Sequence, residues 1–203
     1  MSNSDLIRWS GLAAILAAGL LSVGALLSLG AAFENSSVSV TTPSYAFSSL
    51  LYLLGAVLLL LALVGLYIRQ AQASGILGLV AFLVAFLGTA LALGATWADL
   101  FVAPALAVEA PRVLDAEPTG MLALGFTLTF LVFLPLGWLL FGVASFRAQI
   151  YPRAAAILLM VGAVIAGLPI PLTEIVLNVA VAWLGFALFT GRGEAVQRPS
   201  RVN

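Results

Sequence analysis

Long apolar stretches constrain the fold of this chain more than any other feature of its sequence. Crossing the hydrocarbon core of a membrane takes about 20 mainly apolar residues in a helix that rises 1.5 Å per residue. Of the 203 residues, 63% are hydrophobic and only 8% are charged, whereas roughly one quarter of a soluble globular chain is charged. The sequence therefore predicts an all-α integral membrane protein.

Six apolar segments qualify as membrane-spanning helices, and the last two are short. The expected spans are residues 9–33, 46–68, 75–100, 120–146, 154–168 and 171–190. The Gly-Leu-Pro-Ile-Pro sequence at 167–171 separates the last two, because neither proline fits the interior of a helix. We expect residues 1–190 to form one six-span bundle, without a second folded domain, and residues 191–203 to form a disordered cytoplasmic tail.

The arginines predict the orientation of the bundle. Short cytoplasmic connections of membrane proteins carry an excess of basic residues. With the N-terminus in the cytoplasm, the inner side holds Arg8, Arg69, Arg147, Arg153, Arg192, Arg198 and Arg201. Arg112 alone lies outside, together with several acids, so both termini are expected to be cytoplasmic. A cleaved signal peptide is the alternative for the first segment, although its apolar stretch exceeds the usual 7–15 residues.

Two weaker patterns concern the packing of the spans. The sequence that follows Arg8 is similar to the one that follows Arg153, which would suit three hairpins of the same orientation or arise from composition alone. Small residues recur at helical spacing, so that helix backbones can approach closely. They are Gly11, Ala14, Ala18 and Gly19 on the first span, and Gly78, Ala81, Ala85, Gly88 and Ala92 on the third. These faces serve either a compact monomer or a homo-oligomer.

Missing residue types exclude much chemistry. The chain has no cysteine, histidine or lysine. This removes disulfides, thiolate and imidazole catalysis, haem or zinc ligation, and the lysine of a Schiff base or P-loop. A formal net charge of zero argues against nucleic-acid binding. We expect no cofactor, no bound metal and no enzymatic activity.

Asp99 is the first polar residue of interest, because it follows a long apolar run. Carboxylates at membrane depth are costly and tend to face cavities that carry function. Helical spacing places Thr89, Thr96 and Asp99 on one face, seven and then three residues apart. The alternative is that Trp97 marks the membrane surface and Asp99 is already hydrated.

Glu174 and Asn178 form a second feature, four residues apart at the start of the last span. They either share an inward face or serve the helix start, where Thr173 could cap and an acid complements the helix dipole. Arg112, in the connection 104–118, could reach Asp99 or Glu174. The candidate ligand-binding set is thus Asp99, Thr96, Trp97, Glu174, Asn178 and Arg112.

Two further residues carry structural predictions. Pro135 lies inside the fourth span and should kink it. Trp183, near the middle of the last span, is expected to fill space between helices, where its indole N–H needs an acceptor.

Two functional interpretations remain open. The first is a non-catalytic membrane component or accessory subunit, which the apolar interior and the lack of reactive groups favour. The second is a small-molecule, lipid or proton-coupled transporter or binder with an outward-facing polar cavity around Asp99, Glu174 and Asn178. Both place a multi-pass protein in the cell membrane of a bacterium or archaeon, in contact with the lipid bilayer and with copies of itself or a partner protein.

Overall fold

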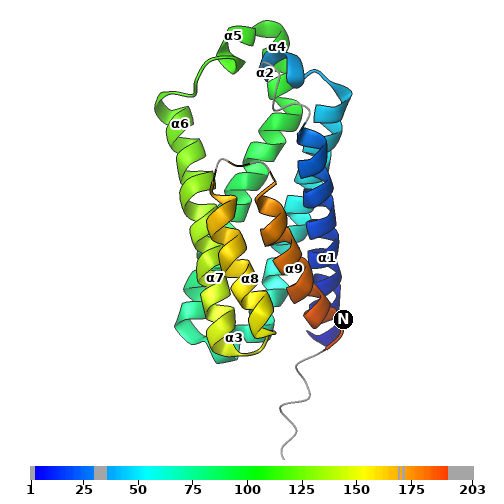
Figure 1. The fold of residues 1–203 in the computed structure, drawn as a ribbon, viewed down its shortest axis with the longest axis vertical. Coiled ribbons are helices and arrows are strands. Elements are labelled where there is room, and N and C mark those ends of the chain that lie inside the picture. Colours follow the sequence, from blue (N-terminus) through cyan, green and yellow to red (C-terminus); the bar gives the residue numbers. More distant parts are fainter. Residues whose placement is uncertain (1–2, 30–35, 169, 171, 192–203) are drawn as a thin grey trace, which may run out of the picture.

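The protein is all-helical in the part of the chain that its structure describes. The computed structural model describes residues 3–29, 36–168, 170 and 172–191, and Figure 1 shows its helices. They are α1 (Asn3–Ser28), α2 (Ser36–Ser39), α3 (Pro43–Phe101), α4 (Ala103–Glu109), α5 (Pro111–Leu114), α6 (Gly120–Phe126), the π-helix η2 (Thr127–Phe133), α7 (Leu134–Ala148), α8 (Arg153–Ala166) and α9 (Glu174–Phe189). The predicted tail lies outside the described residues, apart from Gly191.

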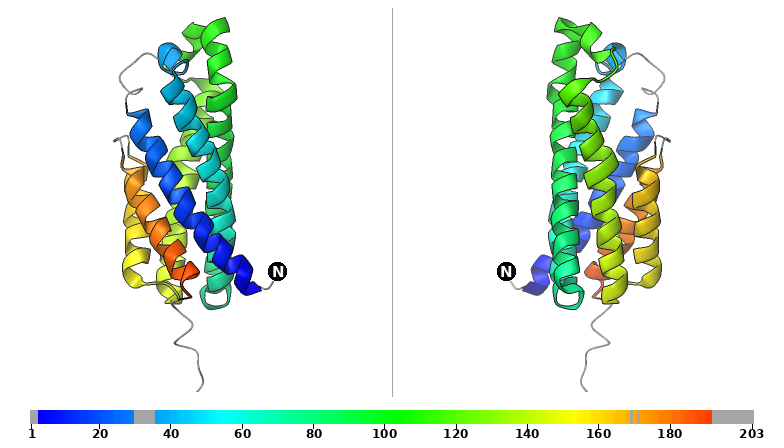
Figure 2. Two further views of the ribbon diagram at one scale, coloured as in Figure 1. Left: turned by 90° about the vertical axis from the view of Figure 1, so that its right-hand side faces the viewer. Right: turned by 90° about the vertical axis from the view of Figure 1, so that its left-hand side faces the viewer.

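Helix α3 consists of two limbs that meet at Gly75. This residue has φ of 55° and ψ of −143° inside an otherwise helical segment, a conformation that glycine adopts without the steric cost of a side chain. Figure 2 shows the two limbs running in opposite directions. We call residues 43–74 the descending limb and residues 76–101 the ascending limb. Tyr67 and Phe82 stack across the hairpin, with ring centroids 4.5 Å apart.

Three helices are long and apolar enough to cross a membrane: Asp5–Ser28, Pro43–Phe101 and Gly120–Ala148. Helices α8 and α9 are apolar but have only 14 and 16 residues. At 1.5 Å per residue these lengths are about 21 and 24 Å, less than the roughly 30 Å of a bilayer core. The chain therefore carries the long apolar helices of a membrane-associated protein, together with one short hairpin.

The long helices and the short hairpin form a closed ring. Helix α3 packs against α1 and α7, α7 packs against α8, α8 against α9, and α9 returns to α1. The largest fully buried side chains, among them Trp138, Phe141, Leu63 and Leu159, fill the interior of this ring. Because α1 contacts α9, the two ends of the described chain hold the ring together.

Small residues lie where the helices approach most closely, as the sequence pattern predicts. Ala81 and Ala85 on the ascending limb are fully buried. A Cβ atom added to Gly137 of α7 would collide with the main chain of Ala85. On the other side of the ring, a Cβ atom on Gly11 of α1 would lie 2.7 Å from the carbonyl oxygen of Gly185 in α9. Gly19, by contrast, meets nothing within 4 Å, so the predicted stripe on the first span packs only in part.

Pro135 is associated with a widened turn. Residues Thr127–Phe133 form a π-helix directly before it, and the amide of Leu134 donates to the carbonyl oxygen of Thr129, five residues back. Proline has no N–H to continue the α-helical pattern, and single π-turns inside α-helices are often found at functional sites. A π-helix therefore lies directly before Pro135, where the sequence predicts a kink.

The prediction for Trp183 is wrong, and another tryptophan fills the core. Trp183 is 42% exposed. Trp138 is fully buried instead, and its indole N–H donates to the hydroxyl of Thr89 at 3.2 Å. Thr89 itself donates to the carbonyl oxygen of Ala85 at 2.7 Å, so it belongs to the core and not to a face shared with Asp99.

A substitution at the contact between α3 and α7 tests this packing. In Gly137→Ala the added methyl group must push the α3 backbone away, and overpacking of this kind costs about 1–3 kcal/mol. We expect a lower midpoint in thermal unfolding of the protein in a mild detergent. Gly94→Ala is the matched control, because its Cβ atom meets nothing within 4 Å. Equal midpoints for the two variants would show that the helices do not depend on this close contact.

Candidate functional site

Asp99 lies near the end of the ascending limb, close to a tyrosine from the start of the descending limb. The descending limb begins at Pro43, and the side chain of its N-cap residue, Thr42, accepts a hydrogen bond from the amide of Tyr45. This start places Tyr45 near Asp99, and both side chains line the same cavity. Asp99 is half-buried, so it is neither freely hydrated nor sealed in the core.

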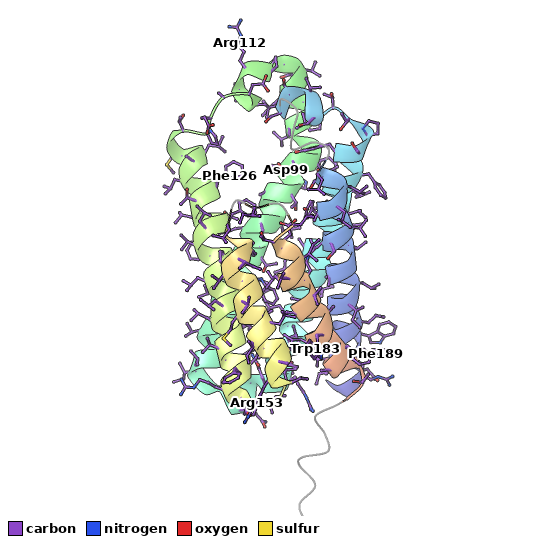
Figure 3. The ribbon with its side chains drawn as sticks, in the orientation of Figure 1. Asp99, Arg112, Phe126, Arg153, Trp183 and Phe189 are labelled. Carbon is purple, nitrogen blue, oxygen red and sulfur yellow. The ribbon has the colours of Figure 1, made fainter. Side chains whose placement is uncertain are left out.

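Two cavities meet at Asp99. The first, the cap cavity, has a volume of about 560 Å³ and lies between α3 and the short helices above it. The second, the side cavity, has about 260 Å³ and lies between the ascending limb and α6 with η2. Both are lined by Ala98, Asp99, Leu122 and Phe126. In Figure 3 the Phe126 ring projects from α6 toward the limb that carries Asp99.

The short helices α2, α4 and α5 form an outer cap at one end of the bundle (Figure 1), and residues of all three line the cap cavity. One carboxylate holds two parts of this cap together. The amide and the hydroxyl of Ser37 donate to the two oxygens of Asp115, at 2.9 and 2.8 Å. These two hydrogen bonds hold the pKa of Asp115 below its usual value of 3.8, because they stabilise the charged form. The connection 104–118 thus contains short helices, α4 and α5, and Asp115 joins it to the connection that precedes α3.

Glu174 and Asn178 belong to a different polar cluster, where α9 meets α1 and the descending limb. The hydroxyl of Tyr52 donates to Glu174 Oε1 at 2.7 Å, and Asn178 Nδ2 donates to the hydroxyl of Ser22 at 3.3 Å. Neither Glu174 nor Asn178 lines the cap cavity or the side cavity. Tyr45 and Tyr52 are seven residues apart on one limb; Tyr52 is hydrogen-bonded to Glu174, and Tyr45 lines the same cavity as Asp99.

The helix-start interpretation of Glu174 holds in one respect and fails in another. Helix α9 begins at Glu174, which places the carboxylate in its first turn, where it complements the helix dipole. Thr173 does not cap the helix. Its hydroxyl donates instead to the carbonyl oxygen of Ile170 at 2.9 Å.

The remaining members of the candidate set point elsewhere. Thr96 donates to the carbonyl oxygen of Leu93 on its own helix, at 2.9 Å. Trp97 is 53% exposed and lies against Phe101. Arg112 is exposed and projects from the cap away from the helices (Figure 3). Of the six candidates, Asp99 is thus the one that lines the two cavities.

A buried polar cluster at the opposite end of the bundle does not follow from the sequence pattern. The Ser145 hydroxyl donates to Gln70 Oε1 at 2.7 Å, and the buried Tyr151 donates to the carbonyl oxygen of Leu66 at 2.9 Å. Gln70 is fully buried, and its Nε2 has no hydrogen-bond partner among the residues that the structure describes. In the sequence, the signal for this cluster is the polar Gln70 next to Arg69. A glutamine at this position is equally typical of a hydrated turn.

Comparisons with protein-family models, with curated proteins and with solved structures find no match for this chain. Among the described residues, no group of three or more acidic side chains is placed to hold a metal ion. The chemistry of the site therefore has to be argued from the cavities and the residues that line them.

The link between Ser37 and Asp115 predicts a pH response of the outer cap. Because the pKa of Asp115 is lowered on folding, its contribution is complete above the unfolded value of 3.8 and is lost as the pH falls through the lower folded value. We expect hydrogen exchange at the Ser37 amide, corrected for the intrinsic rate, to lose protection over this acidic range. In Asp115→Ala the amide should be unprotected at every pH. Glu117→Gln is the control, and an unchanged exchange rate in Asp115→Ala would contradict the link.

Proposed function

We propose that the chain is a multi-pass protein of the cell membrane, with six spans and both termini in the cytoplasm. The distribution of arginines supports this orientation. Arg8 lies near the start of α1, Arg69 near the turn at Gly75, and Arg147 and Arg153 flank the connection between α7 and α8. All of these belong to one end of the bundle, whereas Arg112 lies in the cap at the other end (Figure 3). This asymmetry fits the positive-inside rule.

The short helices α8 and α9 are the last two spans in this proposal. A bilayer accommodates a short span by thinning locally, at a modest cost per ångström. Glu174 and Asn178, at the outer end of α9, are both hydrogen-bonded to neighbouring helices. These polar groups therefore do not require the outer end of α9 to reach bulk water.

We further propose that the protein is non-catalytic and binds a small molecule in its outer half. The observation that carries this proposal is the meeting of two cavities at a half-buried carboxylate, Asp99. Mostly apolar cavities of a few hundred cubic ångströms, with a few convergent polar groups, are typical of ligand sites. An ionisable residue at membrane depth supports the same conclusion, since its cost is usually balanced by function.

An accessory subunit is the second candidate, and one observation favours it. The side cavity is lined by the small residues Ala95 and Gly125, from two different helices. Small residues are enriched where transmembrane helices meet, so a partner helix could occupy this position. A partner that remains bound in a mild detergent and is lost from Gly125→Leu would support this function over small-molecule binding.

The topology can be tested with single cysteines, because the natural chain contains none. A membrane-impermeant maleimide added to intact cells should label Arg112→Cys. Gln72→Cys, next to the turn at Gly75, should be labelled only after the membrane is permeabilised. The opposite result, or labelling of both positions from outside, would contradict the proposed orientation.

Filling the junction of the two cavities tests the binding site. A neutral aliphatic diazirine alcohol, activated by light on protein in lipid nanodiscs, should form adducts on the peptides that contain Leu106 and Leu122. In Ala98→Trp the indole occupies the junction, and we expect roughly tenfold less labelling, the equivalent of about 1.4 kcal/mol. Gly94→Trp adds the same bulk to the same limb outside both cavities and should behave like the wild type. Equal labelling of all three proteins would remove the site.

A further inference from the structure

We infer that the ligand of the two cavities is a lipophilic organic cation, with an ammonium or phosphonium centre at Asp99 and an apolar body in the cavities. This inference rests on the proposed small-molecule site and adds the chemical class of its ligand. It depends on the charge, the aromatic groups and the shape of the lining.

The charged side chains that line the cavities are all acidic. The cap cavity has Asp99, Asp115 and Glu117, and the side cavity has Asp99. Among the described lining residues there is no arginine, and the whole chain has no lysine or histidine. Arg112, the arginine of the cap, projects away from the helices (Figure 3). An anionic ligand would therefore meet carboxylates without a compensating charge.

Asp99 is the carboxylate that a ligand can use. Both oxygens of Asp115 are already engaged by Ser37. Asp99 lies on the wall of the cap cavity together with Tyr45, and a carboxylate can accept about four hydrogen bonds. A charge at membrane depth is costly without a partner, and an organic cation would supply the opposite charge that the lining lacks.

The other lining groups fit the rest of such a ligand. Tyr45 and Phe126 both line the cap cavity, and the faces of aromatic rings attract cations. The side cavity continues from Asp99 between apolar side chains and one buried hydroxyl, that of Thr129. Its apolar lining includes Leu91, Met121 and Phe130. A ligand with its charge at one point and an apolar body on either side would match this arrangement.

A pair of ions with the same shape and opposite charge tests the inference. Tetraphenylphosphonium and tetraphenylborate are each added to the wild-type protein in phosphatidylcholine nanodiscs before photolabelling with the neutral diazirine alcohol. We expect the phosphonium to protect the peptides that contain Leu106 and Leu122, and the borate not to protect them. In Asp99→Asn the concentration of phosphonium needed for protection should rise by about tenfold or more.

Two further variants separate charge from structure. Asp99→Glu keeps the carboxylate and should retain the preference for the cation. Glu109→Gln removes an exposed acid of α4 that lines neither cavity, and should leave protection unchanged. Equal protection by both ions, or an unchanged response in Asp99→Asn, would overturn the cation assignment. The proposed small-molecule site would still stand in that case, as long as Ala98→Trp reduces the photolabelling. Labelling that Ala98→Trp does not reduce would instead remove the proposed site.

Discussion

Close contact between helix backbones is the constraint on which the rest of this structure depends. Lipid tails are as apolar as leucine, so the hydrophobic effect does not hold spanning helices together, and packing must do so. At Gly137 against Ala85, and at Gly11 against Gly185, the backbones are too close to admit even a methyl group. These contacts close the ring of helices on two sides. The outer cap and its cavity depend on that ring. The ring fixes the positions of the helices that the cap connects.

Hydrogen bonds between helices then specify which faces meet. Trp138 with Thr89 joins α7 to α3, and Tyr52 with Glu174 joins α3 to α9. Each hydrogen bond satisfies a polar group that would cost several kcal/mol if it were left unpaired in these apolar surroundings. The pairs also lie at different depths of the bundle, so together they oppose both rotation and sliding of the helices. Few polar residues are therefore sufficient to define one arrangement.

The helices could be predicted from the sequence, because their signals are local. Apolar runs, the glycine at position 75 and the prolines after residue 166 determine where the helical segments begin and end. The stripe of Ala81, Ala85 and Gly88 likewise indicates a contact face from spacing alone. These features require no knowledge of which helix lies beside which.

The site could not be predicted in the same way, because its partners are distant in the sequence. Tyr52 and Glu174 are 122 residues apart, and no spacing rule connects them. Thr96 shares a helix face with Asp99, yet its hydroxyl is satisfied by its own backbone. Arg112 lies in the right connection, but only the structure shows its direction. Asp99 was identified because an acid in an apolar run is informative before any partner is known.

The hydrogen bonds between Ser37 and Asp115 have a consequence for how a molecule would arrive at Asp99. They hold the outer cap over the larger cavity, whereas the side cavity lies between the ascending limb and α6, whose Met121 is 81% exposed. With the six spans proposed above, a molecule entering by this side would come from within the bilayer. Its partition coefficient into lipid would then govern occupancy as strongly as its affinity for the protein, and a compound dilute in water could still fill the site.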